Sequence, residues 1–404
     1  MATNQILTNS LITGKSARVL SNNLVLSKLV NRNYDDYFAQ AGNKGGQAIS
    51  VRLPARYTTR TGAVVDIQPD TETYTPLVFV NPIGVDLTFT TYERTFSLDN
   101  FADRVINPAM TQLANSIDAA GYTATFLSVY NAVGTPGTAL TTSTAQAAVL
   151  AAAAKLYDND APVDDGMLHE INGTSFNATL SGSNSSIFNP QREIGEIYVK
   201  GMQGDFGGFQ HYMSQLVPSF TNGARTTATG SVTSTTGSSV VTGGWTTGDV
   251  IKAGTIVTFS GTNSVNPQTR QDQGSLQQFV ATTTTTADGS GNMTLVVSPT
   301  PVLTGAFQNV TALPTGTVTP LGASNATTKN ALAFHRDAFM LATVPLPIPG
   351  GVVQGAQAIA KDTRVPVRMV TQYDIHTDQW ITRFDSAIAW APLYSALATR
   401  ICTT

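Results

Sequence analysis

The sequence predicts an α+β protein into which an all-β, barrel-like domain is inserted. Three observations support this prediction. Residues 98–131 repeat apolar side chains at steps of three or four, which is the period of a helix. Residues 46–96 are rich in β-branched and aromatic residues, which is typical of strands. Residues 226–328 carry only five charged side chains among runs of Thr, Ser, Gly and Val, and this change of composition indicates a separate β domain.

Composition narrows the function classes. Only 12% of the 404 residues are charged, about half of the roughly 25% that is usual. A subunit whose surface is covered by neighbours tolerates this better than a monomer does. The net charge is -3 and no basic stripe exists, so contact with nucleic acid is expected to be weak and non-specific. No apolar run reaches 18 residues, so no membrane contact is expected.

The chemistry-bearing residues do not form a catalytic or metal-binding pattern. Cys402 is the single cysteine, so an internal disulfide and a thiolate cage are excluded. The four histidines lack metal-ligand spacing, and GxSxG is absent. No enzyme activity, cofactor or metal is therefore expected. His335 is expected to anchor a turn. The acidic pairs Asp158/Asp160 and Asp164/Asp165 are read as solvated turns, with cation binding as the alternative.

The first hundred residues predict an arm and a long loop. Residues 1–32 have a loose helical spacing of apolar residues. Residues 46–96 predict a two-stranded excursion with a polar tip, which needs another surface to lie against. Its charges are read either as a solvated hairpin or as contacts to neighbouring subunits, and the second reading is preferred because such pairs set register. The residues concerned are Arg52, Arg56, Arg60, Asp66, Asp70 and Glu72.

Two helices and several strands follow. The helix over 98–131 begins at Ser97 and kinks at Pro108, or a second helix begins at Asn107–Pro108. An alanine-rich helix is predicted over 144–157, with Ser143 and Gln146 as its capping box. KNALAFHRDAFMLATVPLP is either a helix or a strand–turn unit, and VPVRMVTQYD and DQWITRFDSAIAWAP are predicted strands.

In this order, the segments LDNFADRVINPAMTQLANSID, GEIYVKGMQGDFGGFQHYMSQLVP, KNALAFHRDAFMLATVPLP and WAPLYSALATRI resemble the major capsid proteins of tailed phages, which have the Johnson (Hong Kong 97 type) fold. The coat-protein branch of Salmonella short-tailed phages, which carries an insertion domain, is the most similar. The resemblance implies an N-terminal arm (1–32), an extended β loop region (33–97), a spine helix and peripheral domain (98–190), an axial domain (191–225 and 329–404) and an inserted β domain (226–328).

The resemblance also implies a function. Copies would form hexamers and pentamers of an icosahedral shell around DNA, with a portal protein as partner, in a virion assembled in the host cytoplasm. Residues 46–96 contain no lysine, so the lysine-based cross-link of some relatives is not expected and the shell would be non-covalent. The chain enters the fold within about ten residues, so a separate scaffolding protein is expected.

Two other classes compete with this reading. The Thr/Ser/Gly-rich segment 226–328 is also typical of surface-layer or adhesin-like β-proteins. The absence of a signal-peptide pattern and the alanine-rich helix at 144–157 argue against that class. A hydrolase with an appended β domain ranks last, because no acid–base pair or nucleophile site can be assembled from the sequence.

Overall fold

The computed structural model describes residues 9–33, 48–60, 62–65, 67–68, 72–79, 82–90, 105–162, 166–185, 205–359 and 363–403. The chain divides into two compact units. Unit 1 combines residues 1–51, 75–122 and 339–391, and unit 2 combines residues 52–74, 123–338 and 392–404. The chain therefore crosses between the units several times, and each unit is assembled from segments that are distant in sequence.

A five-stranded sheet forms the body of unit 1. Its order is β18 (Phe339–Val344), β21 (Gln379–Pro392), β20 (Pro366–Asp374) and β19 (Gln354–Ile359), and β3 (Ile83–Thr90) also pairs with β21. All the pairs that involve β19, β20 and β3 are antiparallel. The two strands predicted from VPVRMVTQYD and DQWITRFDSAIAWAP are β20 and β21.

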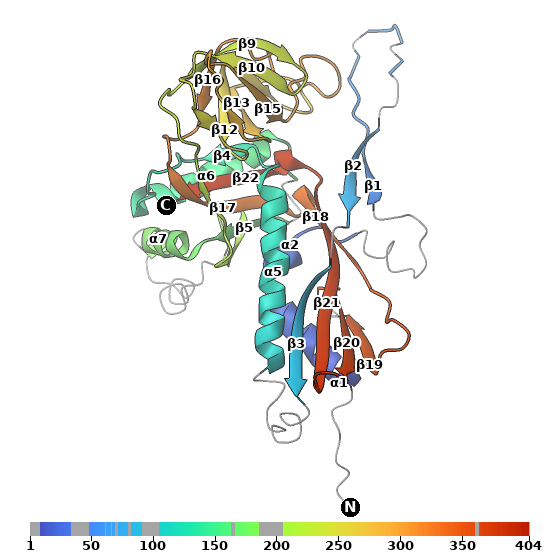
Figure 1. The fold of residues 1–404 in the computed structure, drawn as a ribbon. Coiled ribbons are helices and arrows are strands. Elements are labelled where there is room, and N and C mark those ends of the chain that lie inside the picture. Colours follow the sequence, from blue (N-terminus) through green and yellow to red (C-terminus); the bar gives the residue numbers. More distant parts are fainter. Residues whose placement is uncertain are drawn as a thin grey trace, which may run out of the picture. The chain divides into compact units, whose positions relative to one another are not determined.

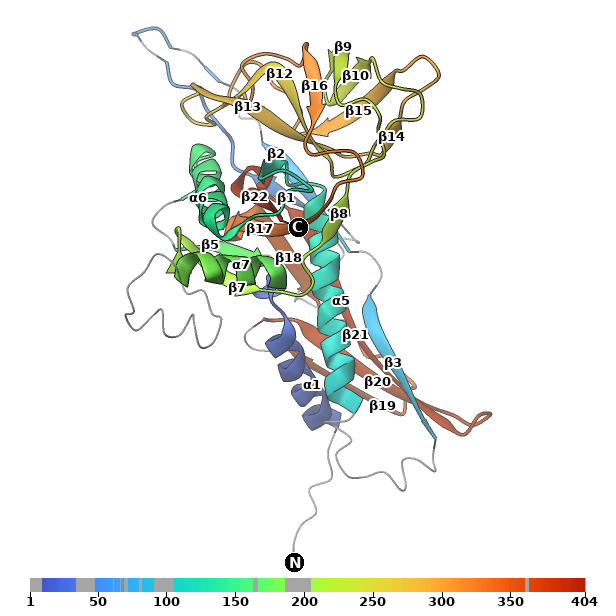
Figure 2. The same ribbon diagram turned by 90° about the vertical axis from the view of Figure 1, so that its left-hand side faces the viewer.

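Helices cover this sheet. Figure 2 shows α1 (Asn9–Asn23) and α5 (Asn107–Phe126) on the same side of the strands, and α1 packs on β19 and β20. The Asp118 carboxylate of α5 accepts hydrogen bonds from the backbone N–H groups of the chain entering the short helix α2 (Leu26–Leu29), at 2.7–3.2 Å. This buried carboxylate therefore ties the predicted N-terminal arm to α5.

The long helix α5 is present, and its start bears on the two predicted beginnings. α5 begins at Asn107 with Pro108 in its first turn, and the two residues before it, 105–106, form a π-helical turn that runs directly into it. Proline is tolerated there because the first N–H groups of a helix have no intrahelical acceptor. Ser97 lies outside the described residues. The helix ends at Phe126, earlier than predicted, because the chain turns at once into β4 (Asn131–Val133).

A seven-stranded mixed sheet forms one part of unit 2. Its order is β4, β22 (Ala398–Thr403), β17 (Thr327–His335), β5 (Leu168–Asn172), β7 (Phe209–Met213) and β6 (Asp205–Phe206), with β8 (Ser219–Thr221) also on β17. KNALAFHRDAFMLATVPLP therefore forms a strand–turn unit of β17, the turn η2 (Arg336–Ala338) and β18. His335 anchors the turn as predicted, because its Nδ1 accepts the Asp337 N–H at 3.2 Å.

The helices α6 (Thr142–Asp158) and α7 (Thr174–Ser185) share an apolar core with one face of this sheet. The predicted cap of α6 is wrong by two residues. Thr141 caps the helix and forms a capping box with Thr144, whereas Ser143 lies inside the first turn. Both patterns fit the sequence signature, because hydroxyl residues fill positions 141–144.

A closed six-stranded barrel forms the other part of unit 2 (Figure 1). Its strands are β9 (Gly230–Thr236), β10 (Ser239–Gly243), β12 (Ile256–Val265), β13 (Asp272–Ala281), β15 (Met293–Ser298) and β16 (Thr317–Pro320), with β11 (Val250–Ile251) and β14 (Thr285–Thr286) as a separate pair. Residues 327–328, which the sequence placed in the insertion, belong to β17 and pair with β8. The chain therefore leaves and re-enters the sheet on adjacent strands.

Of the two-stranded excursion predicted over 46–96, a shorter part is observed, because residues 83–90 form β3 on the sheet of unit 1. β1 (Ala48–Leu53) and β2 (Thr73–Val78) form a sheet of their own. The last elements of the chain are the short η3 turn (Ser395–Leu397) and β22, which lies between β4 and β17 in the mixed sheet.

Candidate functional site

The loop between β1 and β2, called here the extended loop (residues 54–72), is held by a few polar contacts. At its base Arg52 Nη1 lies 3.3 Å from Glu72 Oε2, and both side chains are exposed. Further out, the Gln68 amide accepts from the Thr58 N–H and donates to the Thr58 carbonyl, both at 2.7 Å. One side chain thus takes the place of a strand-to-strand backbone pair.

The extended loop exposes three aliphatic side chains, called here its apolar tip, whereas Asp66 and Asp70 of the predicted polar tip lie outside the described residues. Val64, Val65 and Ile67 are 85%, 71% and 87% exposed. Three aliphatic residues within four positions (Val-Val-Asp-Ile) were the available signal. The neighbouring Asp, Thr and Pro residues masked it when the segment was judged by average polarity. Contiguous exposed apolar residues in a soluble chain mark contact sites.

The predicted contact arginines have partners within the chain. Arg56 lies over the Phe307 ring, 5.8 Å from its centroid, and Arg60 donates to the Gly62 carbonyl. Arg270 of the barrel donates to the Tyr57 carbonyl at 2.8 Å. Of the six predicted residues, the structure pairs Arg52 with Glu72, and Asp66 and Asp70 lie outside the described residues.

A second candidate surface is the barrel junction, where the barrel meets the mixed sheet. An apolar cluster joins Ile256 and Val280 of the barrel to Tyr130, Ala132 and Cys402. Successive residues of a strand point to opposite faces. Accordingly, Ile401 of β22 joins the core under α6 while the next residue, Cys402, joins this cluster. β22 therefore contributes to the helix-covered core with one face and to the barrel junction with the other.

Gln278 of β13 is the polar centre of the barrel junction. Its Oε1 accepts from the Ala132 N–H at 2.7 Å, and its Nε2 donates to the Ala132 carbonyl at 3.1 Å. Lys155 of α6 donates to the same Oε1 at 2.6 Å. Burial lowers the pKa of Lys155 to about 8. The barrel is thus fixed to both β4 and α6.

The acidic turn after α6 gives the barrel a further attachment. Gln273 donates to the Asp158 carbonyl at 2.6 Å, and Asn266 donates to Asp160 Oδ1 at 3.0 Å. In the part of the chain that the structure describes, no group of three His, Cys, Asp or Glu residues could hold a metal ion. The Asp160 carboxylate and the Asp158 backbone carbonyl thus contact the barrel, and Asp164 and Asp165 lie outside the described residues.

A buried acid–base pair lies within the mixed sheet. Glu170 Oε2 lies 3.6 Å from His211 Nδ1, and both side chains are inaccessible to solvent. Burial raises the pKa of Glu170 to about 8 and lowers that of His211. His211 Nε2 donates to the Phe206 carbonyl at 3.0 Å, so Nδ1 is the acceptor nitrogen of a neutral ring. The proton of the pair therefore resides on Glu170.

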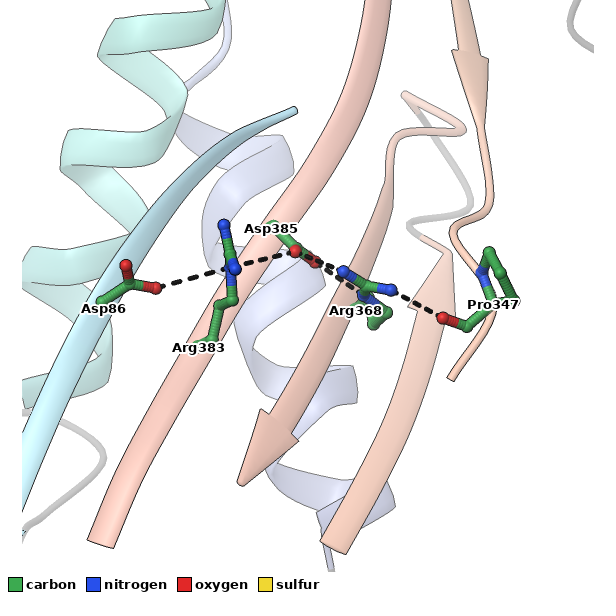
Figure 3. Close-up of polar contacts among 5 residues, drawn as sticks. All are labelled: Asp86, Pro347, Arg368, Arg383 and Asp385. Atoms are coloured by element: carbon green, nitrogen blue, oxygen red, sulfur yellow. Dashed lines mark hydrogen bonds and ion pairs between the residues drawn. The ribbon is translucent and has the colours of Figure 1, made fainter. Parts of the chain in front are cut away.

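An ion-pair ladder crosses the sheet of unit 1, as Figure 3 shows. Asp385 of β21 is 1% exposed and binds Arg368 of β20 through two hydrogen bonds of 2.9 and 2.6 Å. Arg383 Nε lies 3.3 Å from Asp385 and 3.6 Å from Asp86 of β3. Arg368 also donates to the Pro347 carbonyl at 2.6 Å. The strand register places these residues opposite one another.

None of the described helices is long and apolar enough to cross a membrane. What the described residues offer is an exposed apolar tip on an extended loop and a barrel fixed to a sheet. The exposed aliphatic side chains are the part of this arrangement that is available for contact with another surface.

Comparison with known proteins gives a family. Residues 1–394 match the family model described as "P22 coat protein - gene protein 5". No curated protein matches the sequence. A structure from Mycobacterium phage Che8 is similar with a TM-score of 0.51 and 11% identity, over 94% of this chain and 90% of that chain. The capsid of Ralstonia phage GP4 has a TM-score of 0.47 and 8% identity, over 93% and 87%. The capsid structure of cyanophage P-SCSP1u has a TM-score of 0.45 and 11% identity, over 89% and 84%.

Proposed function

The chain belongs to the P22 coat protein family, and we propose that its copies are joined without covalent cross-links, through the extended loop and the N-terminal arm. It is a phage major capsid protein that forms an icosahedral shell, and its α+β fold is shared with the Che8 structure. We further propose that the fold is of the Hong Kong 97 type, with the branch-specific insertion formed by the barrel.

The apolar tip of the extended loop carries this proposal. Val64, Val65 and Ile67 have aliphatic side chains that are exposed to solvent in the isolated chain. Burying apolar surface gains roughly 25 cal/mol per Å², so the tip supplies a favourable contact wherever a neighbouring subunit covers it. A shell repeats that contact in every copy, and a small gain per subunit therefore becomes large for the assembly.

Replacing the tip residues together tests this role. The triple variant Val64→Ser, Val65→Ser, Ile67→Ser should fold as the parent does, because these side chains have few neighbours to lose. Its shell yield by sedimentation should fall at least tenfold, since about 1.4 kcal/mol per contact corresponds to a factor of ten. Leu276→Ser, at an exposed barrel position, serves as control. Normal shells from the triple variant would refute the role of the tip.

The charges of the extended loop form the second part of the proposal. We propose that Arg52, Arg56, Arg60, Asp66, Asp70 and Glu72 set the register with neighbouring subunits. Complementary charge fixes orientation more than raw affinity. Reversing Arg56 and Arg60 to Glu should leave the chain folded but impair shell formation. The circular dichroism spectrum and melting of the variant chain must be checked first, because Arg56 lies over Phe307.

The barrel is proposed as a brace within each subunit. Two observations support this: the adjacent exit and re-entry at β8 and β17, and the contacts of the barrel junction. Replacing residues 226–324 by a short Gly/Ser linker keeps β17 intact. The resulting chain should give fewer or less heat-resistant shells. Shells of normal yield and normal melting would exclude bracing.

The remaining proposals concern domains, partners and place of assembly. We propose an N-terminal arm at 1–32, an extended loop region at 33–97, a spine helix and peripheral domain at 98–190, and an axial domain at 191–225 and 329–404. Hexamers and pentamers would assemble in the host cytoplasm with a scaffolding protein and a portal protein, around DNA that is contacted weakly. The role is structural rather than enzymatic. Negative-stain microscopy with and without scaffold tests this, and closed shells that form only with scaffold are the expected result.

A further inference from the structure

A fully buried arginine lies at the barrel junction without an acidic partner. Arg400 of β22 is 2% exposed. Its Nη1 donates to the Gly254 carbonyl at 2.8 Å, its other terminal nitrogen donates to the Phe126 carbonyl, and its guanidinium lies 3.8 Å from the Phe126 ring centroid. No carboxylate of the described residues forms an ion pair with it. A buried cation without a counter-charge costs several kcal/mol.

The arginine remains charged at neutral pH. Burial lowers its pKa to about 9, which still leaves it protonated at pH 7. The neighbouring Cys402 thiol cannot neutralise it, because burial raises the thiol pKa to about 11. Among the described groups the positive charge therefore has carbonyl dipoles and an aromatic face as partners, but no anion.

A small pocket opens next to this charge. Its lining combines barrel residues with sheet residues, and includes Gly254, Ile256, Asn330, Arg400 and Cys402. The space is about that of a single water molecule. Two buried donors of lining residues have no hydrogen-bond acceptor, namely Arg400 Nε and Asn330 Nδ2. Asn330 pairs with Cys402 across β17 and β22, so Asn330 and Arg400 are diagonal neighbours on one face of the sheet.

We propose that this pocket binds one small monovalent anion, of the size of chloride or bromide, between Arg400 Nε and Asn330 Nδ2. The available donors and the single positive charge agree with such an ion. Water is a poorer occupant, because it leaves the charge uncompensated. Since the pocket is lined from the barrel and from the sheet, the anion strengthens the attachment of the inserted barrel to the body of the subunit.

Thermal unfolding of the full-length protein tests the proposal. At constant ionic strength, replacing gluconate with chloride or bromide should raise the midpoint temperature of unfolding by roughly 2–4 °C. The increase should level off as the halide concentration rises. Gluconate is too large for the pocket and serves as the reference anion. The chloride NMR line width of the same samples reports binding directly and should broaden with added protein.

Two variants separate this site from general salt effects. Arg400→Met fills the space of the arginine stem without its charge and should lose the chloride response. Asn330→Asp places a carboxylate beside Arg400. This variant should show no effect of chloride on its unfolding midpoint, and its midpoint in gluconate should be higher than that of the parent. Equal midpoints of the parent in gluconate and chloride would overturn the proposal, as would a chloride response that persists in Asn330→Asp. If Arg400→Met does not fold, Asn330→Asp and the chloride NMR line width test the proposal without it.

Discussion

At the residue scale, a few buried ionisable side chains restrict which arrangements of the chain are stable. Asp118, Glu170, Asp385 and Arg400 are each nearly or fully buried, although only 12% of residues are charged. Asp385 pairs with two arginines, the Asp118 carboxylate accepts hydrogen bonds from backbone N–H groups, and Glu170 retains its proton. A buried charge that is matched to one partner rejects other arrangements of the chain.

The Glu170–His211 pair predicts a pH dependence of stability. Because the folded-state pKa of Glu170 is raised from 4.5 to about 8, its contribution is full below pH 4.5 and is lost as the pH rises towards 8. Glu170→Gln should remove this loss and gain a few kcal/mol at most at pH 8. Urea unfolding of both proteins at pH 5 and pH 8 measures it. His211 acts in the opposite direction, and because both proteins contain it, its effect cancels in the comparison. Equal pH slopes would contradict the prediction.

The ion-pair ladder gives a matched pair of variants. Asp385→Asn leaves Arg368 buried without its counter-charge and should cost about 3 kcal/mol. Asp86→Asn removes the exposed end of the same ladder, where the side chain is 64% exposed, and should cost less than about 1 kcal/mol. Denaturant titration of both variants checks the difference. Similar losses of unfolding free energy in the two variants would mean that the buried Asp385 contributes no more than the exposed Asp86.

At the scale of elements, local signals placed the helices well and their ends less well. The alanine-rich run of α6 and the apolar stripe of α5 both fold as helices. Their ends depend on which of several hydroxyl or turn residues is used, and the competing choices differ by about 1 kcal/mol or less. The structure selects Thr141 because its side chain and that of Thr144 satisfy each other's backbone donors.

Two alanine variants distinguish Thr141 from Ser143 as the N-terminal cap of α6. Thr141→Ala should destabilise the protein by about 1 kcal/mol, because an N-terminal donor of the helix loses its acceptor. Ser143→Ala, at the cap position predicted from sequence, should change stability by less than half as much. Thermal unfolding of the two variants gives the comparison. The reverse order of effects would restore the sequence-based cap.

At the scale of the whole molecule, unit 2 consists of two parts, the barrel and the mixed sheet, which are joined by two chain connections and by side-chain contacts. The chain leaves the sheet at β8 and returns at β17, and Gln278 fixes the barrel to β4 and α6. A domain attached at adjacent ends can unfold separately from its host. The side-chain contacts of the barrel junction therefore decide whether the two parts unfold together.

Gln278→Ala tests that coupling. It removes the two-way bond to Ala132 and leaves Lys155 without this acceptor, at a cost of about 2–4 kcal/mol. Calorimetry should then show a separate transition for the barrel. Gln271→Ala, an exposed glutamine of the same domain, should melt as the parent does. A single unchanged transition in Gln278→Ala would show that the apolar cluster alone couples the parts.

The α+β class, the strands β1 to β3, the helices α5 and α6 and the strand-rich character of the segment that forms the barrel could be predicted from the sequence, because they depend on periodicity and composition within short windows. The apolar exposure of Val64, Val65 and Ile67 could not be predicted from the sequence, because exposure depends on what the rest of the chain leaves uncovered. The partners of Gln278 and Arg400, more than a hundred residues away in sequence, were equally out of reach. Such contacts become visible in the folded chain alone, since they arise from the paths of several segments at once.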